Sequence, residues 1–130
     1  RMEGLTKQYG IAIGVTSETL EKVVNAESLL VREIDTVKVK GKEKPITVYE
    51  IFNADPENIQ EQKIHLDWQY TEALQLYKNR NWREALQLFT TLRRSLPTDK
   101  VIEIYCERCQ AFLDYPPNES WNGITRLREK

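Results

Sequence analysis

The spacing of apolar residues changes near residues 53–65 and divides the chain into two parts. Before this stretch, short apolar runs and alternating patterns predict strands, and after it apolar residues recur at helical spacing. The stretch itself is polar and contains Pro56, so we expect a linker over 53–65. The sequence therefore predicts an α+β fold, in which a mixed first part (1–52) precedes an all-α second part.

The beginning of the first part predicts a helix, a strand and a second helix. Residues 1–9 are typical of the end of a helix that Gly10 terminates. The apolar run 11–15 predicts a buried strand. Thr16 supplies a hydroxyl cap, so we expect a helix from there to about Asn25.

A β-hairpin follows. Within residues 29–40, Val37 and Val39 alternate with polar residues, which predicts a strand with one apolar face. Residues 41–44 turn the chain, and Pro45 opens a return strand that runs to Ile51, at a position where its missing N–H does little harm.

The second part predicts three helices, at about 66–78, 82–95 and 101–113, with Asp99 as the cap of the third. We expect this helical extension to cover 66–115 and a tail to follow over 116–130. The predicted apolar faces are Trp68, Ala73, Leu74 and Tyr77, then Ala85, Leu86, Leu88, Phe89 and Leu92, then Val101, Ile104, Tyr105, Cys109, Phe112 and Leu113.

Composition narrows the possible functions. The 130 residues carry 19 Lys+Arg and 20 Asp+Glu, a net charge of −1, which gives no general attraction to nucleic acid or to an anionic membrane. No apolar run approaches the ~18 residues that span a bilayer, and no signal peptide is recognisable. We expect a cytoplasmic location, with any membrane anchor supplied by upstream segments. Because residue 1 is Arg, the chain is interpreted as trimmed or as beginning within a longer protein.

Cys106 and Cys109 form a C-x-x-C pair. A structural zinc site needs four ligands, and His65 could add only a third. A thioredoxin-like motif should follow a strand, whereas this pair lies within a predicted helix. We therefore interpret the cysteines as small helical side chains in a reducing compartment.

The helical part resembles a tetratricopeptide repeat, a pair of helices of about 34 residues. Ala73 occupies the small position of the first helix, Trp82 opens the second, and Ala85, Phe89 and Pro97 follow at the expected spacing. About three repeats are needed for independent stability, so we expect these helices to pack on the first part or on another chain.

Residues 1–52 resemble the end of a class III nucleotidyl cyclase catalytic domain, which has a ferredoxin-like fold. The resemblance is carried, in order, by residues 1–10 with their Arg1-Met2-Glu3, the strand 11–15, residues 16–19, residues 31–42 with Val39-Lys40-Gly41-Lys42, and residues 45–51 with Pro45 and Tyr49-Glu50. The helical part, including 120–127, resembles the extension that follows this domain in some bacterial adenylate cyclases.

This resemblance implies conversion of ATP to 3′,5′-cyclic AMP and pyrophosphate, the reaction of a phosphorus–oxygen lyase in intracellular signalling. Arg1 matches the arginine that stabilises the transition state, and Lys40 matches the lysine that contacts the triphosphate. The family also uses Mg²⁺ or Mn²⁺ held by two aspartates, and works as a dimer with composite sites. We therefore expect the longer protein to be a homodimer, with protein contacts through its helical extension.

The segments that carry the metal-binding aspartates in the family are absent from this sequence, and we do not expect Asp35 or Asp55 to replace them. The 130 residues alone are accordingly predicted to bind no metal and to be inactive. Lys38 and Lys44 are interpreted as solvated residues that discourage edge pairing. The alternative is a non-catalytic, TPR-like interaction module that carries a cyclase remnant.

Overall fold

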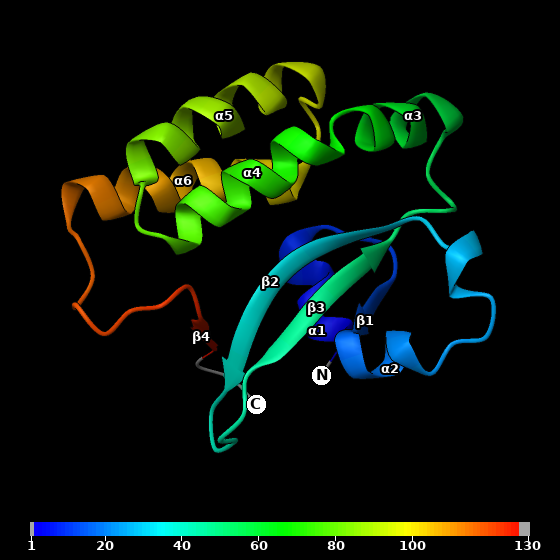
Figure 1. The fold of residues 1–130 in the computed structure, drawn as a ribbon, viewed down its shortest axis with the longest axis horizontal. Helices are drawn as coiled ribbons and strands as arrows, with labels where there is room; N and C mark the ends of the chain where they lie inside the picture. The colour runs from blue at the N-terminus through cyan, green and yellow to red at the C-terminus, as the bar shows by residue number, and fades with distance from the viewer. Residues whose placement is uncertain (1, 128–130) are drawn as a thin grey trace. The chain divides into compact units, whose positions relative to one another are not determined.

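The computed structural model describes residues 2–127, which form two compact units. The sheet unit comprises residues 2–55 and 124–127, and the helical unit comprises 56–123. The elements of the sheet unit are α1 (Met2–Tyr9), β1 (Gly14–Thr16), α2 (Ser17–Glu21), a 3₁₀ turn (Ala26–Ser28), β2 (Val31–Val39), β3 (Ile46–Ile51) and β4 (Thr125–Leu127) (Figure 1). The mixed α+β class predicted from the sequence is confirmed.

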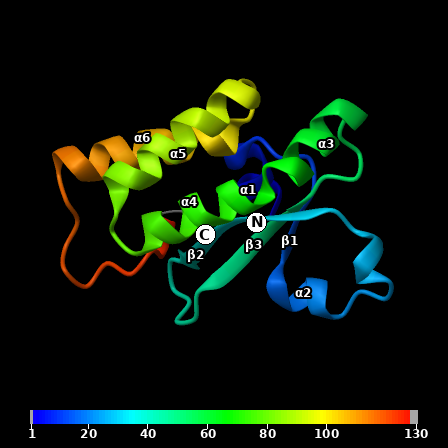
Figure 2. The ribbon, with the colours of Figure 1, turned by 45° about the horizontal axis from the view of Figure 1, so that its top comes forward.

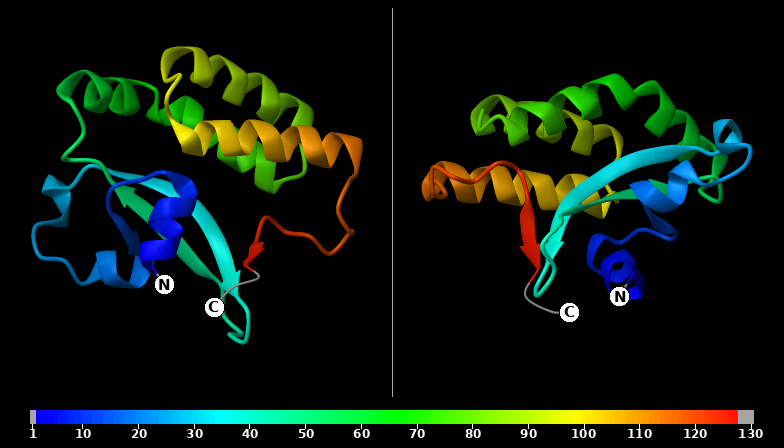
Figure 3. Two further views of the ribbon diagram at one scale, coloured as in Figure 1. Left: turned by 180° about the vertical axis from the view of Figure 1, so that it is seen from behind. Right: turned by 60° about the horizontal axis from the view of Figure 1, so that its bottom comes forward.

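The four strands form one sheet in the order β1-β3-β2-β4. Strand β3 pairs antiparallel with both β1 and β2, and β4 pairs parallel with the last residues of β2. Figure 3 shows β4, in red, alongside the end of β2, in cyan. The far end of the chain therefore completes the sheet that its beginning forms.

A bulge in β2 sets which of its residues are buried. The pairing register with β3 shifts between Glu33 and Asp35, and the consecutive residues Ile34 and Asp35 are both buried. An extra residue in one strand breaks the simple alternation of faces. As a result, the buried positions are even-numbered before the bulge (Arg32, Ile34) and odd-numbered after it (Asp35, Val37, Val39).

Local capping explains the two helices of the sheet unit. Gly10, with a φ of 66°, ends α1. The Thr16 side chain accepts a hydrogen bond from the Thr19 amide at the start of α2, as predicted. The apolar core of the unit contains Leu5 and Tyr9 of α1 together with the inward residues of β2 and β3.

The helical unit contains α3 (Glu57–His65), α4 (Asp67–Lys78), α5 (Trp82–Ser95) and α6 (Lys100–Asp114). Helix α5 packs against both α4 and α6 (Figure 2). Asp99 caps α6 by accepting hydrogen bonds from the amides of Val101 and Ile102. Helices α4 and α5 contact each other, and each carries a fully buried alanine, Ala73 in α4 and Ala85 in α5.

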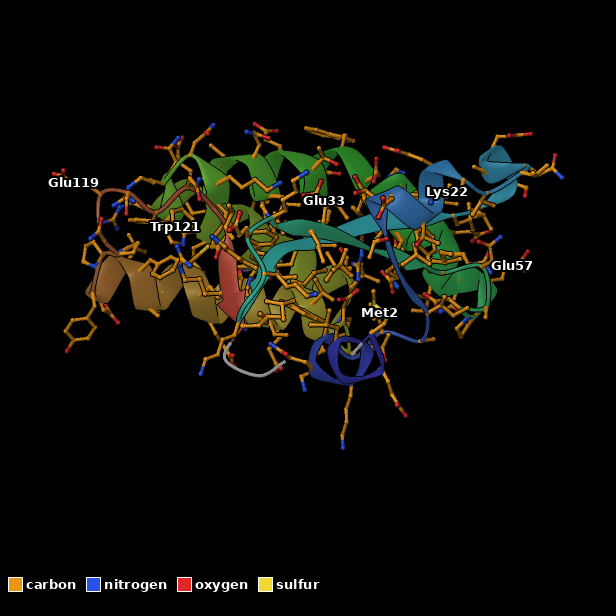
Figure 4. All side chains as sticks on the ribbon, turned by 90° about the horizontal axis from the view of Figure 1, so that it is seen from below. Met2, Lys22, Glu33, Glu57, Glu119 and Trp121 are labelled. Atoms are coloured by element: carbon orange, nitrogen blue, oxygen red, sulfur yellow. The ribbon has the colours of Figure 1, made fainter. Side chains whose placement is uncertain are left out.

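An aromatic cluster holds the segment after α6. The Trp121 ring, labelled in Figure 4, packs against Tyr77, Trp82 and Phe112, with ring centroids 5.1–5.7 Å apart. The Arg80 guanidinium lies over the Trp82 ring and donates hydrogen bonds to the carbonyls of residues 117, 118 and 121. Arg80 itself has a φ of 69°. This arrangement orders the chain between α6 and β4.

Several predicted boundaries are wrong. The strand expected over 11–15 is shorter and later, because it pairs with β3 only from Gly14 to Thr16. The helix expected to reach Asn25 ends at Glu21, and Asn25 adopts a left-handed conformation that no helix continues through.

The polar stretch expected to be a linker contains helix α3, which begins directly after Pro56. The expected tail contains β4, a strand that needs its distant partner β2. Trp68, predicted on the apolar face of its helix, is 65% exposed, because α4 buries the opposite side through Tyr70, Ala73, Leu74 and Tyr77.

Candidate functional site

Lys40 lies at the turn that joins β2 and β3. It is exposed and directly follows the last residue of β2. The Lys42 amide donates a hydrogen bond to the Val39 carbonyl over 2.9 Å, which closes a turn with Lys40 and Gly41 at its centre. Gly41 has a φ of 88°, a conformation that glycine adopts without a Cβ penalty. The turn thus presents the Lys40 side chain to solvent at a defined end of the sheet.

The surroundings of Lys40 are strongly basic. Lys38, Lys42 and Lys44 lie in the same strand end and turn, and Glu43 is the one acidic residue between positions 38 and 44. Strand β4 adds Arg126, which is exposed and is the register partner of Lys38. Ammonium and guanidinium groups donate charge-assisted hydrogen bonds to phosphate oxygens. This end of the sheet therefore has the chemistry of an anion site.

A buried carboxylate connects three elements of the sheet unit. Asp35 is 1% exposed. Its Oδ2 accepts a hydrogen bond from the Tyr9 hydroxyl at 2.5 Å, and its Oδ1 accepts hydrogen bonds from the Thr36 amide and the Thr125 hydroxyl at 2.8 and 3.1 Å. Helix α1, strand β2 and strand β4 therefore meet at this side chain.

An ion pair is buried in the same sheet. The Arg32 Nε atom of β2 lies 2.8 Å from Oε2 of Glu50 in β3, and both side chains are about 5% exposed. The two residues are register partners, so their side chains lie on one face of the sheet. The pair joins β2 and β3 at the end of the hairpin away from the Lys40 turn, on the other side of the bulge.

The sequence predicts two site residues, Lys40 and Arg1, and the structure describes one of them. Lys40 lies at an accessible, basic turn, as just described. Arg1 lies outside the described residues, and α1 begins at Met2, the next residue in the sequence.

The described residues do not fit a divalent metal. Among positions 2–127, no group of three or more His, Cys, Asp or Glu side chains is placed to hold a metal ion. The Asp35 oxygens are buried and engaged with hydrogen-bond donors.

Cys106 and Cys109 are free, buried thiols on α6. Burial is the main cause that raises the pKa of both, that of Cys109 to about 12. Because the thiolate is the nucleophile and metal ligand, burial and a raised pKa both disfavour nucleophilic or metal-binding chemistry at these side chains. The interpretation of the C-x-x-C pair as helical packing residues is confirmed.

Sequence reasoning missed Tyr9, Asp35, Thr125 and Arg126. One signal was present, since Asp35 has the same odd-numbered spacing as Val37 and Val39 and so belongs on their apolar face. Its donors Tyr9 and Thr125 lie 26 and 90 residues away in sequence, and nothing local connects them. Arg126 joins the basic turn only through the long-range pairing of β4.

Comparison with known proteins gives two matches. The sequence is 32% identical over 110 residues to an adenylate cyclase of Dictyostelium discoideum described as terminal-differentiation specific, which covers 84% of this chain and 5% of that protein. It is 48% identical over 52 residues to an adenylate cyclase of Anabaena cylindrica, which covers 39% of this chain and 10% of that protein. The chain thus spans a small part of the relatives it matches.

Neither a protein-family model nor a solved structure matches the sequence. The Dictyostelium match is longer than the sheet unit, so it includes part of the helical unit as well. The chain is therefore related to proteins named adenylate cyclase, through both of its units in one case. Among the described residues, no helix has the length and apolar character to span a membrane.

Proposed function

We propose that this sequence is part of an adenylate cyclase of class III, with the sheet unit as the last part of the catalytic domain and the helical unit as a TPR-like extension. The observation that carries the proposal is the exposed Lys40 at a basic hairpin turn, in a chain related to two adenylate cyclases. The inclusion of helical residues in the longer match supports an extension that accompanies the catalytic part.

The proposed reaction closes ATP on itself. The 3′ oxygen attacks the α-phosphorus and forms an O3′–P bond. The bond between the α-phosphorus and the oxygen that bridges it to the β-phosphorus breaks, and pyrophosphate leaves. The proton of the 3′ hydroxyl passes to solvent. Lys40 holds the triphosphate as a point charge. Arg1 offers a planar fork of donors to the α-phosphoryl oxygens, where charge is greatest in the transition state. Mg²⁺ or Mn²⁺ would be held by residues outside this sequence.

A matched pair of lysine variants tests the role of Lys40. In the longest natural protein that carries this sequence, Lys40→Ala should raise the KM for ATP by about 10-fold or more, the scale of one charge-assisted contact. Lys44→Ala removes an exposed lysine of the same turn and should leave the KM within twofold. Equal effects of the two substitutions would contradict the assignment of Lys40.

Arg1 is tested through turnover. Arg1→Ala in the same protein should lower kcat by about 100-fold, as expected for the loss of one preorganised donor to the transition state. A wild-type kcat would refute this role. The isolated 130 residues should form no cyclic AMP above a buffer control, because no group of three or more potential metal ligands comes together among residues 2–127.

In the proposed longer protein, two copies of the chain contribute residues to each active site, so the protein is a homodimer. Sedimentation at micromolar concentration should give twice the monomer mass. If the wild-type protein is monomeric and forms no cyclic AMP from ATP, the interaction-module alternative replaces the enzyme.

A further inference from the structure

We propose that Asp35 is a positioning residue for the nucleotide site: its buried carboxylate holds helix α1, which follows Arg1, and strand β4 onto strand β2, which ends beside Lys40. This inference rests on the function proposed above. It assigns a role to a side chain that touches neither ATP nor the reacting atoms.

The contact with α1 is at the last residue of that helix. Tyr9 is fully buried, and its hydroxyl donates to Oδ2 of Asp35. Apolar contacts of the Tyr9 ring alone would let α1 shift along β2 at little cost. A hydrogen bond weakens steeply as its distance and angle change, so it opposes such a shift. The Tyr9–Asp35 bond therefore fixes where α1 lies along β2, and with it the helix start that follows Arg1.

The contact with β4 is on the other carboxylate oxygen. Thr125, the first residue of β4, donates its hydroxyl to Oδ1 of Asp35 and is the register partner of Val37. Strand β4 has only three residues, so its ladder with β2 is short. The Thr125–Asp35 bond adds a side-chain contact that fixes this strand beside the segment that leads to Lys40.

The orientation of the carboxylate is fixed from within β2. Oδ1 also accepts a hydrogen bond from the amide of Thr36, the next residue. The bulge before Asp35 turns consecutive residues inward, so that Asp35 is buried without disturbing the pairing of Val37 and Thr36 with β3. A valine could fill the same space, but it would accept no hydrogen bond from α1 or β4. The polar side chain thus specifies position as well as packing.

This placement predicts different kinetic effects for the Tyr9–Asp35 and Thr125–Asp35 hydrogen bonds. Loss of the Tyr9 hydroxyl frees α1 and the helix start after Arg1, whose proposed role is in the transition state. Loss of the Thr125 hydroxyl frees β4 and the strand end before Lys40, whose proposed role is in holding the triphosphate. The first change should therefore act on kcat and the second on the KM for ATP.

The test uses Tyr9→Phe, Thr125→Val and Asp35→Val in the longest natural protein that carries this sequence. Tyr9→Phe should lower kcat per folded molecule about 10-fold with KM within twofold, the scale of one buried hydrogen bond. Thr125→Val should raise the KM about 5-fold or more with kcat within twofold. Asp35→Val should combine both effects. Ile34→Ala is the control, since it removes buried apolar atoms from β2 but leaves Asp35 and its donors in place.

Hydrogen exchange followed by mass spectrometry gives a readout that does not depend on activity. Exchange should be faster by about 10-fold in peptides from α1 for Tyr9→Phe and in peptides from β4 for Thr125→Val, with β3 unchanged in both. The exchange measurement keeps the test decisive if Asp35→Val does not fold.

The outcomes separate the two proposals. A wild-type protein without cyclase activity overturns the proposed function, and the exchange pattern then decides whether Asp35 positions α1 and β4. The wild-type protein could instead be active while the activity of each of the three variants falls only in proportion to its folded fraction, as that of Ile34→Ala does. This result overturns the positioning role and leaves the proposed function intact. Unchanged exchange in α1 and β4 overturns it as well.

Discussion

Arg32 and Glu50 lie directly opposite each other on β2 and β3 and form an ion pair inside the sheet, with 2.8 Å between Nε and Oε2. Both charges are buried, and the attraction between them offsets part of the hydration that each loses on burial. The pair also marks a single register, because a shift of β3 by one residue against β2 would place the two side chains on opposite faces of the sheet.

Replacing one residue of this pair should lower the free energy of unfolding much more than replacing both. Arg32→Met removes the cation that lies 2.8 Å from the buried Glu50 carboxylate, and we expect the free energy of unfolding to fall by about 3–5 kcal/mol. The double variant Arg32→Met/Glu50→Leu should recover most of that loss, because apolar side chains of similar volume replace the pair. Urea unfolding followed by far-ultraviolet circular dichroism measures both. Equal destabilisation of the single and double variants would contradict this prediction.

The Arg80 guanidinium should stabilise the helical unit through its shape as well as its charge. It donates to the carbonyls of Pro117, Asn118 and Trp121, so we expect Arg80→Lys to lose about 1–3 kcal/mol of unfolding free energy, nearly as much as Arg80→Ala. The three tryptophans of the chain, at 68, 82 and 121, all belong to this unit and report its unfolding by fluorescence.

A red-shifted emission should accompany both Arg80 variants, because Trp82 and Trp121 pack on each other beneath the guanidinium. Arg83→Ala, an exposed arginine on α5, is the matched control and should change neither the emission nor the urea midpoint. Full retention of stability by Arg80→Lys would show that charge alone accounts for the role of Arg80.

The predictions from sequence succeeded where local signals were strong. The bounds expected for the helix at 82–95 are those of α5, where an apolar stripe lies between the break at 79–81 and Pro97. Asp99 was identified as a cap because Asp ahead of an apolar-periodic run satisfies the free amides of a helix start. The hairpin and its turn followed from alternation, glycine and proline.

The failures have physical causes. Helix α3 has no apolar stripe for periodicity to detect, although its Glu, Gln and Lys residues are good helix formers. Strand β4 has three residues, and its existence depends on β2, nearly 90 residues earlier. For the same reason, the local sequence placed Lys40 at its turn but gave no sign of the Thr125–Asp35 contact or of Arg126 beside Lys38.

Gly41 should matter through its backbone conformation alone. A Cβ at this position would meet no atom within 4 Å, yet the φ of 88° is strained for any side chain. We expect Gly41→Ala to cost about 1–2 kcal/mol and to raise the KM for ATP several-fold, because the turn that carries Lys40 must change shape. The urea midpoint and steady-state kinetics measure the two effects.

Gly4 provides the matched control for Gly41. It lies inside α1, and a Cβ there would also meet nothing within 4 Å. Gly4→Ala should therefore stabilise the protein by about 0.4–1 kcal/mol and leave the KM unchanged. Stabilisation by Gly41→Ala as well would show that the turn adopts another conformation.

Cys109 should make the helical unit less stable at alkaline pH. Burial raises the pKa of its thiol from 9.0 to about 12 in the folded state. Between these two values the unfolded chain loses the thiol proton while the folded chain keeps it, so the free energy of unfolding falls as pH rises above about 9. Below pH 9 both states hold the proton and the contribution is fully present. Cys109→Ala should accordingly flatten the decline in urea midpoint between about pH 8.5 and 10.5, measured by tryptophan fluorescence. An identical slope for wild type and Cys109→Ala would contradict the assignment.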